Sequence, residues 1–200
     1  MHTTLYLIRH GEAYNPEQII YGRAPVPLTD KGRQQIKDLA ERFKKEQVIP
    51  DIIIASPIRR TVETAEEIKK VFPQTPLHFE KNLQEHGGDL SSMTIKHLLS
   101  LGDYYMAQEC IEMGLERPES IVNRMYTVMQ KVIKTYPGKT IFIVSHGDPL
   151  AWLIWKLLHP TDPIPSILDI QDTYPQQGQA RQVLFDENGK LLQTHPFCSA

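Results

Sequence analysis

The sequence has few cysteines, no surplus of basic residues and no long hydrophobic run in its 200 residues. Its two cysteines, Cys110 and Cys198, lie far apart and form no metal-binding spacing, which argues against a disulfide framework and favours a reducing, cytoplasmic location. With 22 basic and 24 acidic residues, the formal net charge is −2, so nothing favours binding to nucleic acid or to an anionic membrane. Any bound anion must be held by a few placed cations.

Neither a membrane span nor a leader segment is predicted. The longest apolar stretch, around residues 150–158, is too short to cross a bilayer, and the apolar part of "MHTTLYLIRH" is too short for a signal peptide. Internal repeats and low-complexity tracts are absent as well. With 40% hydrophobic residues, the length suits a single domain over residues 1–200 with a sizeable core.

Three continuous apolar runs predict buried strands at residues 4–8, 51–55 and 140–144. Their lack of polar alternation is typical of parallel strands that helices cover on both faces. Other segments carry apolar residues at helical spacing. We expect helices over 30–46, 57–72, 118–136 and 149–158. Thr29 is the expected cap of the first helix, and Ser56 and Pro57 are expected to begin the second.

Alternating strands and helices predict an α/β fold, a three-layer α/β/α sandwich with a mostly parallel sheet. The C-terminal stretch "RQVLFDENGKLLQTH" predicts two further strands joined by an Asn-Gly hairpin turn. Residues 81–117 are less regular and more polar, and we expect them to form a small, largely helical cap or insert beside the sheet.

Polar clusters follow each of the three predicted parallel strands. "LYLI" runs into Arg9-His10-Gly11, "IIIA" into a segment containing Arg60, and "IFIV" into Ser145-His146-Gly147. Ligands of open α/β sheets bind outside the carboxyl ends of the strands, so these clusters should meet at one place. Two histidines with planar arginine forks and two helix N-termini suit a phosphate group.

The chain resembles the histidine phosphatase superfamily, also called phosphoglycerate-mutase-like, over most of its length. The motifs that carry this resemblance are R-H-G-E at 9–12, G-R…P-L-T at 22–29, G-x-x-Q at 32–35, S-P-x-R-R-T-x-E-T-A at 56–65, L-x-E at 83–85 and S-H-G at 145–147. R-H-G alone would be weak, whereas the whole set in this order is specific.

The resemblance implies a role for each matching residue. His10 is the expected nucleophile that becomes phosphohistidine, and Arg9 and Arg60 are the expected phosphate clamp. His146 is implied as a second imidazole on the phosphoryl group, and Glu85 as the acid that protonates the leaving oxygen. A carboxyl group beside an anion has its pKa raised, which suits an acid, although acidic residues in irregular segments are more often surface groups.

Further residues are expected around the substrate. Arg23, Asn15, Glu12 and His86 are predicted substrate contacts; Tyr104 and Tyr105 either line the same mouth or pack the cap. Arg59 is expected to be solvated at the start of its helix. No metal is expected, because five other histidines show no ligand spacing: His2, His78, His97, His159 and His195.

Four departures from the family pattern lie around the expected substrate. Ala13 stands where many relatives carry Ser or Thr, and Asn15 falls one position early for the usual phosphate-binding Asn. Pro25 replaces a frequent Asp, and Asp148-Pro149 follows S-H-G where small residues are common.

The predicted function is cofactor-independent hydrolysis of small phosphate monoesters. One alternative is a phosphoglycerate mutase using the same pocket, although such mutases generally carry a longer insertion between the acid and the second histidine. Another is a catalytically inactive phosphate-binding protein of the same fold.

Overall fold

A six-stranded mixed sheet forms the centre of the computed structural model, which describes residues 2–197, so Cys198 lies outside the described residues. The strands lie in the order β3-β2-β4-β1-β5-β6. Their bounds are β1 Thr3–Arg9, β2 Ile52–Ala55, β3 Leu77–Phe79, β4 Thr140–Ser145, β5 Ala180–Phe185 and β6 Leu191–Phe197. Strands β3, β2, β4 and β1 are parallel neighbours. Strand β5 pairs antiparallel with β1, and β6 pairs antiparallel with β5.

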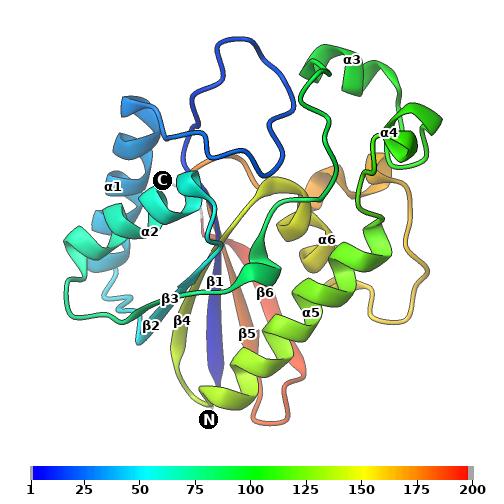
Figure 1. Ribbon diagram of the computed structural model, residues 1–200. Coiled ribbons are helices and arrows are strands. Elements are labelled where there is room, and N and C mark those ends of the chain that lie inside the picture. Colours follow the sequence, from blue (N-terminus) through cyan, green and yellow to red (C-terminus); the bar gives the residue numbers. More distant parts are fainter. Residues whose placement is uncertain (1, 198–200) are drawn as a thin grey trace.

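Helices cover both faces of the sheet, as the three-layer prediction required (Figure 1). One face carries α1 (Asp30–Lys45) and α2 (Arg59–Val71), and the other carries α5 (Pro118–Thr135) and α6 (Gly147–Leu158). Successive β1 residues point to opposite faces: Leu7 packs in the α5–α6 core, whereas Ile8 packs in the α1–α2 core. Burial on both sides explains why β1 reads as an unbroken apolar run.

Helices α1 and α5 agree with the predicted bounds to within one residue, whereas α6 begins at Gly147, two residues earlier than predicted, and α2 begins two residues later. Thr29 caps α1, because its hydroxyl accepts from Gly32 N at 2.9 Å. The prediction that Ser56 and Pro57 begin the second helix is wrong, since α2 begins at Arg59 with Ile58 as its cap residue. The Ser56 hydroxyl lies 2.8 Å from His146 Nε2 and contacts Ile58 N only at 3.4 Å, so it belongs to a strand-end cluster rather than to a helix cap.

The carboxyl ends of the parallel strands meet the loop over residues 10–29 and the segment 81–117 (Figure 1). That segment is mostly turns, with the short helices η1 (Lys81–Leu83), α3 (Ile95–Ser100) and α4 (Gln108–Glu112), and is less helical than expected. A final short helix, η2 (Ile167–Thr173), packs on α6. The predicted C-terminal hairpin is present as β5–β6, although residues 186–190 make a longer turn than Asn-Gly alone.

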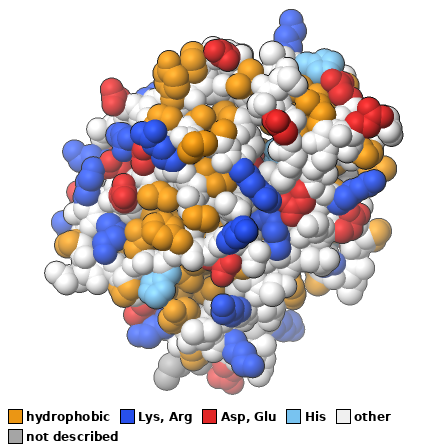
Figure 2. All heavy atoms as spheres, in the orientation of Figure 1, with side chains coloured by type: hydrophobic (Ala, Val, Ile, Leu, Met, Phe, Trp, Pro, Cys, Tyr) orange, Lys and Arg blue, Asp and Glu red, His pale blue; other side chains and the backbone are white. Residues whose placement is uncertain are grey.

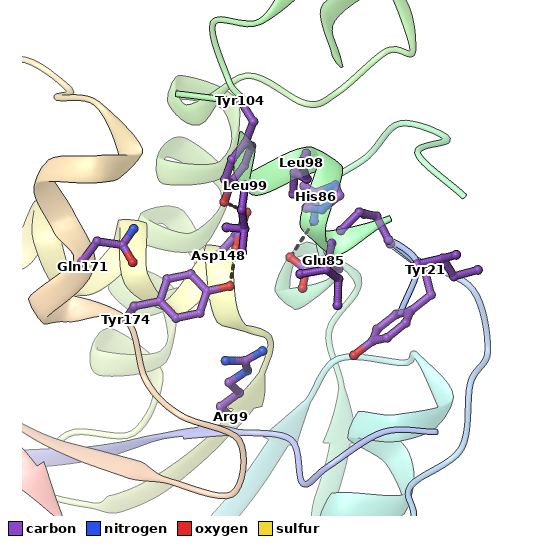
Figure 3. A pocket seen from close by; sticks show the side chains of 14 residues that line it. Arg9, Tyr21, Glu85, His86, Leu98, Leu99, Tyr104, Asp148, Gln171 and Tyr174 are labelled. Carbon is purple, nitrogen blue, oxygen red and sulfur yellow. Dashed lines mark hydrogen bonds between the residues drawn. The ribbon is translucent and has the colours of Figure 1, made fainter. Parts of the chain in front are cut away.

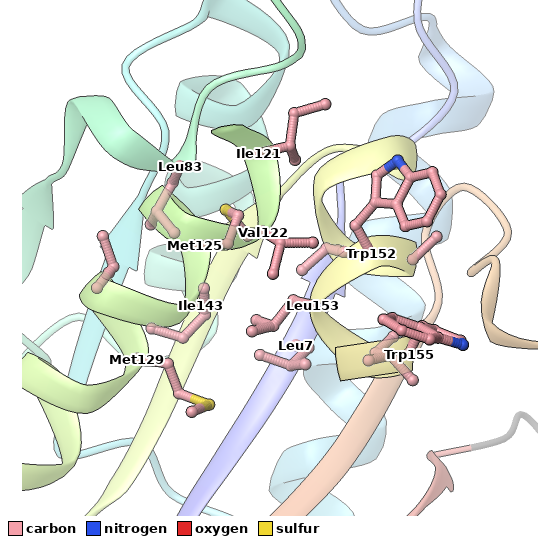
Figure 4. Packing of buried hydrophobic residues seen from close by; sticks show 14 of the residues in the cluster. Leu7, Leu83, Ile121, Val122, Met125, Met129, Ile143, Trp152, Leu153 and Trp155 are labelled. Carbon is pink, nitrogen blue, oxygen red and sulfur yellow. The ribbon is translucent and has the colours of Figure 1, made fainter. Parts of the chain in front are cut away.

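The larger core lies between the sheet and helices α5 and α6. Met125 and Met129 of α5 and Leu153 of α6 pack around Ile143 and Leu7 of the sheet (Figure 4). Fully buried aliphatic side chains of this kind each stabilise the fold by about 1.5–3 kcal/mol. This packing holds in place the strand ends that the polar clusters directly follow.

Surface charge is mixed rather than one-sided on the face seen in Figure 2, where Lys, Arg, Asp and Glu side chains are interspersed. Within residues 2–197, no helix combines the length and apolar character needed to cross a bilayer. Cys110 is buried and forms no disulfide with any described residue.

Replacing Phe142 tests the smaller core, which lies between the sheet and helices α1 and α2. Phe142 is fully buried, with its ring centroid 4.4 Å from that of Phe43 and 5.4 Å from that of Tyr6. We expect Phe142→Ala to lower the free energy of unfolding by about 3–5 kcal/mol in urea titrations, because it leaves a cavity. The control Leu192→Ala, at a half-exposed position of β6, should cost less than about 1 kcal/mol. Equal losses in the two variants would contradict this account of the core.

Candidate active site

Strand register brings the two predicted catalytic histidines together. Arg9 of β1 lies opposite Ser145 of β4, so the next residues, His10 and His146, leave the sheet side by side. His10 N donates to Ser145 O at 3.1 Å, and the two imidazole centroids lie 5.3 Å apart. Two of the three strand ends, those of β1 and β4, therefore converge as expected.

The hydrogen bonds of His10 determine which of its ring nitrogens is free to react. Nδ1 lies 2.8 Å from the carbonyl oxygen of Gly11, which can only accept, so Nδ1 carries the proton. Nε2 accepts from Arg60 Nε at 3.2 Å and therefore holds a lone pair. Gly11 is required beside it, because a Cβ there would collide with the carbonyl group of Gly32. The imidazole is held neutral, with a lone pair on Nε2 that is chemically able to attack an electrophile.

Arg60 is fully buried and is held on several sides. Its Nη2 donates to Gly22 O at 2.7 Å and its Nη1 to Ala24 O at 3.2 Å. Its guanidinium carbon lies 4.7 Å from the ring centroid of Tyr21, a cation–π distance. These contacts tie the loop over residues 10–29 to the start of α2 and fix the cation beside His10.

Arg9 and His146 each carry a buried nitrogen without a partner among the described residues, namely Arg9 Nε and His146 Nδ1. Arg9 Nη1 donates to Pro175 O at 2.9 Å, and its guanidinium lies 5.2 Å from the ring centroid of Tyr174. If the Ser56 hydroxyl donates to His146 Nε2, the ring proton of His146 lies on Nδ1. Both orphaned nitrogens are then donors suited to an anion's oxygens.

Burial keeps both imidazoles neutral. Burial, followed by the charges of Arg60 and Arg9, holds the pKa of His10 well below the ordinary histidine value. Burial and the Arg60 charge likewise hold the pKa of His146 well below its ordinary value. A neutral pair of imidazoles beside two guanidiniums leaves the site positive yet nucleophilic.

Glu85 stands opposite Arg60, with its Oε2 at 4.0 Å from Arg60 Nη2. Burial, and to a smaller extent the negative charge of Asp148, raises the pKa of Glu85. A carboxyl group with a raised pKa can hold a proton near neutral pH. Arg124 of α5 fixes the backbone here, because its Nη1 donates to Asn82 O and Gln84 O at 2.7 Å each.

A cavity of about 290 Å³ opens beside this cluster. Arg9 and Glu85 line it, whereas His10 and His146 lie buried behind them. Figure 3 shows Arg9, Tyr174, Asp148, Glu85 and Tyr21 pointing inward from separate parts of the chain. The lining residues are Arg9, Ile19, Ile20, Tyr21, Gly22, Glu85, His86, Ile95, Leu98, Leu99, Tyr104, Asp148, Gln171 and Tyr174.

Sequence reasoning missed the cluster around Asp148, at the start of α6. Asp148 Oδ1 accepts from Tyr174 OH at 2.6 Å, and Oδ2 accepts from Tyr105 OH at 2.7 Å and Tyr104 OH at 3.1 Å. Burial, together with the Asp148 charge, holds the pKa values of all three tyrosines well above the ordinary value. Tyr104 both lines the cavity and packs the cap, so the two alternatives left open for it coexist. The only sequence signal was the departure from small residues after S-H-G.

Three predicted substrate contacts lie elsewhere. Glu12 pairs with Lys31 at 2.6 Å and does not line the cavity. Asn15 bonds within its own loop, with Nδ2 donating to Ile19 O at 2.9 Å. Arg23 pairs with Glu116 at 3.0 Å and is likewise absent from the lining.

Two other residues lie where the sequence placed them. His86 lines the cavity beside Glu85, as predicted. The Arg59 side chain is 55% exposed and pairs with Glu63, as expected of a solvated residue at a helix start.

Glu85, His86 and Asp148 bring one potential ligand atom each within 4.8 Å of one another. Both Asp148 oxygens already accept tyrosine hydroxyls, and burial favours a protonated Glu85. The cluster therefore gives no ground for assigning a metal.

The neutral histidines generate a pH prediction. In NMR titrations of imidazole Cε1–H shifts, His10 and His146 should stay neutral at pH 6, because burial lowers their pKa values. In the urea-denatured chain, the control, they should titrate near pH ~6.5. The unfolded state alone then gains these protons, so their effect is to reduce stability as the pH falls below about 6.5. Titration of both rings near 6.5 in the folded protein would contradict the assigned tautomers.

Comparison with known sequences identifies relatives over most of the chain. The family model described as "Histidine phosphatase superfamily (branch 1)" matches residues 5–174. Phosphoglycerate mutase-like protein 4 of Arabidopsis thaliana is 30% identical over 152 residues, which are 72% of this chain and 66% of that protein. Uncharacterized phosphatase PhoE of Bacillus subtilis is 27% identical over 78% of this chain and 77% of its own length.

Solved structures share the fold. YhfR of Bacillus stearothermophilus superposes with a TM-score of 0.79 at 27% identity, covering 95% of this chain and 94% of its own. Phosphoserine phosphatase from Entamoeba histolytica, in complex with 3-phosphoglyceric acid, superposes with a TM-score of 0.78 at 24% identity, over 98% of each chain. The family match supports an enzyme that transfers or hydrolyses phosphoryl groups. Because that match extends over most of the sequence, the chain belongs to the histidine phosphatase superfamily.

Proposed function

We propose that the chain hydrolyses phosphate monoesters through a phosphohistidine on His10. The observation that carries the proposal is the neutral imidazole whose Nε2 lone pair faces the buried Arg60 guanidinium at 3.2 Å. Arg9 and His146 add unpartnered buried nitrogens for the phosphoryl oxygens. Phosphoryl transfer depends mainly on positioning and on stabilising charge at the equatorial oxygens, which this arrangement suits.

The first step transfers the phosphoryl group to the protein. Arg60 Nε releases His10 Nε2 and donates to a phosphoryl oxygen instead, so that the freed lone pair attacks phosphorus. The bond from phosphorus to the alcohol oxygen breaks, and its electron pair leaves with that oxygen. Protonated Glu85, 4.0 Å from Arg60, supplies the proton that neutralises the leaving alkoxide.

The second step returns the protein to its starting state. Glu85, now a carboxylate, takes a proton from water as the water oxygen attacks phosphorus. The nitrogen–phosphorus bond breaks, its electron pair returns to His10 Nε2, and inorganic phosphate leaves. No cofactor takes part in either step.

A mutase is the second candidate, favoured by the name of the Arabidopsis relative. In a mutase, the phosphoryl group on His10 would return to a second hydroxyl of the substrate instead of passing to water. A non-catalytic phosphate-binding protein is the third, and it would bind phosphate without forming phosphohistidine.

Substitution of His10 separates these alternatives. With p-nitrophenyl phosphate and with 3-phosphoglycerate, we expect the wild type to release inorganic phosphate and His10→Ala to lose at least about 10³-fold, because the nucleophile is gone. The control His78→Ala changes an exposed histidine of β3 and should keep wild-type rates. Migration of phosphate within 3-phosphoglycerate without release would favour the mutase, and no turnover by the wild type would favour a binding protein.

The acid role of Glu85 predicts a dependence on the leaving group. Glu85→Gln should slow hydrolysis of alkyl phosphates by about 10²–10⁴-fold, because a poor leaving group needs the proton. Hydrolysis of p-nitrophenyl phosphate should fall much less, since nitrophenolate leaves without one. The measurement is kcat/KM for both substrates with the wild type and the variant. Equal losses for the two substrates would contradict the assignment of Glu85 as the acid.

A further inference from the structure

We propose that the organic part of the substrate is uncharged and largely apolar, and that the site discriminates against phosphate esters carrying a carboxylate. This inference rests on the proposed function, because it assumes that Arg9, Arg60 and the two imidazoles bind the phosphoryl group. It concerns the rest of the cavity, whose walls then select the alcohol.

The cavity wall away from the phosphoryl cluster is aliphatic. Its members are Ile19, Ile20, Ile95, Leu98 and Leu99. The two segments that supply them are joined by backbone bonds, because Ile20 N donates to Met93 O at 2.9 Å and Ile95 N donates to Gln18 O at 2.7 Å. Leu99, which lines the cavity at this wall, is 65% exposed. Exposed apolar groups gathered at a pocket mark a ligand surface.

Neighbouring cations are occupied and cannot receive a substrate carboxylate. Arg23 Nη2 and Arg124 Nη2 both bind Glu116 Oε2, at 3.0 and 3.1 Å. Arg23 Nε also donates to Glu85 O at 2.9 Å, and neither arginine lines the cavity. His86 Nδ1 donates to Gly87 O at 3.2 Å, so this nitrogen is occupied as well.

With Arg9 occupied by the phosphoryl group, the Asp148 carboxylate in the lining repels a second anion. Asp148 and Glu85 both belong to the lining, and Asp148 uses three tyrosine hydroxyls, so these donors are not free for a ligand. A like charge placed in a partly buried cavity costs far more than it does in water. An ammonium group would have to displace the hydroxyls from Asp148 to reach its oxygens.

The space suits a ring or a short aliphatic chain. The cavity measures about 290 Å³, roughly twice the ~150 Å³ of a dry cavity that holds benzene. A neutral aryl or alkyl group would gain from burial against the aliphatic wall at about 25 cal/mol per Å². The volume of the cavity, its aliphatic wall and its charged groups therefore all favour an uncharged, apolar alcohol.

A matched pair of non-hydrolysable ligands tests the inference without relying on catalysis. 4-Carbamoylbenzylphosphonate and 4-carboxybenzylphosphonate have nearly the same shape and differ by one negative charge. Calorimetric titration of the wild type should give a Kd at least about tenfold lower for the carbamoyl ligand, as expected for a like charge near the Asp148 carboxylate. A ratio near one, tighter binding of the carboxylate, or no binding of either ligand would overturn the inference.

A charge placed on the wall should alter that ratio. Leu99→Arg puts a cation at the cavity, and we expect the Kd ratio to fall at least about threefold because the carboxylate gains a partner. Leu192→Arg makes the same change at an exposed position of β6 and should leave the ratio within about twofold of wild type. An unchanged ratio in Leu99→Arg, or the same fall in both variants, would contradict the assignment of this wall to the substrate.

Failure of the proposed hydrolysis leaves a different signature. In that case phosphate release from p-nitrophenyl phosphate would be absent or independent of His10, whatever the two phosphonates do. Failure of the present inference would appear as the wrong Kd ratio in a protein whose turnover still depends on His10.

Discussion

The contact between Arg60 and His10 is the constraint on which the rest of the site depends. A buried guanidinium at 3.2 Å from Nε2 requires a lone pair there, and the Gly11 carbonyl oxygen accepts a hydrogen bond from the protonated Nδ1. Burying such a cation is costly unless its donors are satisfied. Gly22 O, Ala24 O and the face of Tyr21 supply that compensation, so the position of His10 depends on the loop over residues 10–29 as well as on strand β1.

The fold brings the cations and imidazoles to one edge of the sheet and buries them away from water. Parallel strands β1, β2 and β4 end at the same edge, and the buried helices on both faces hold those ends in place. Burial then lowers the pKa values of the two histidines and raises that of Glu85. One environment thereby suits both the proposed nucleophile and the proposed proton donor, because removal from water disfavours the charged form of each.

The strand ends were predictable, and the walls were not. Unbroken apolar runs followed by Arg-His or Ser-His have one simple explanation in an α/β sheet, which predicted the positions of His10 and His146, whereas Arg60 was assigned through the family resemblance. The sequence could not show that Ser56 would contact His146 rather than cap α2, because both uses suit a serine after a strand. Strand β3 was missed because it is a three-residue, partly exposed edge strand. Tyr174 and Asp148, far apart in the chain, meet only through the tertiary fold.

The most direct test of the central claim is a crystal structure with orthovanadate, which resembles a phosphoryl group during transfer. The account predicts vanadium bonded to His10 Nε2, with Arg60 moved from that nitrogen onto a vanadate oxygen and with Arg9 and His146 contacting the remaining oxygens. Vanadate bound away from His10, or bound while Arg60 Nε still donates to His10 Nε2, would contradict it.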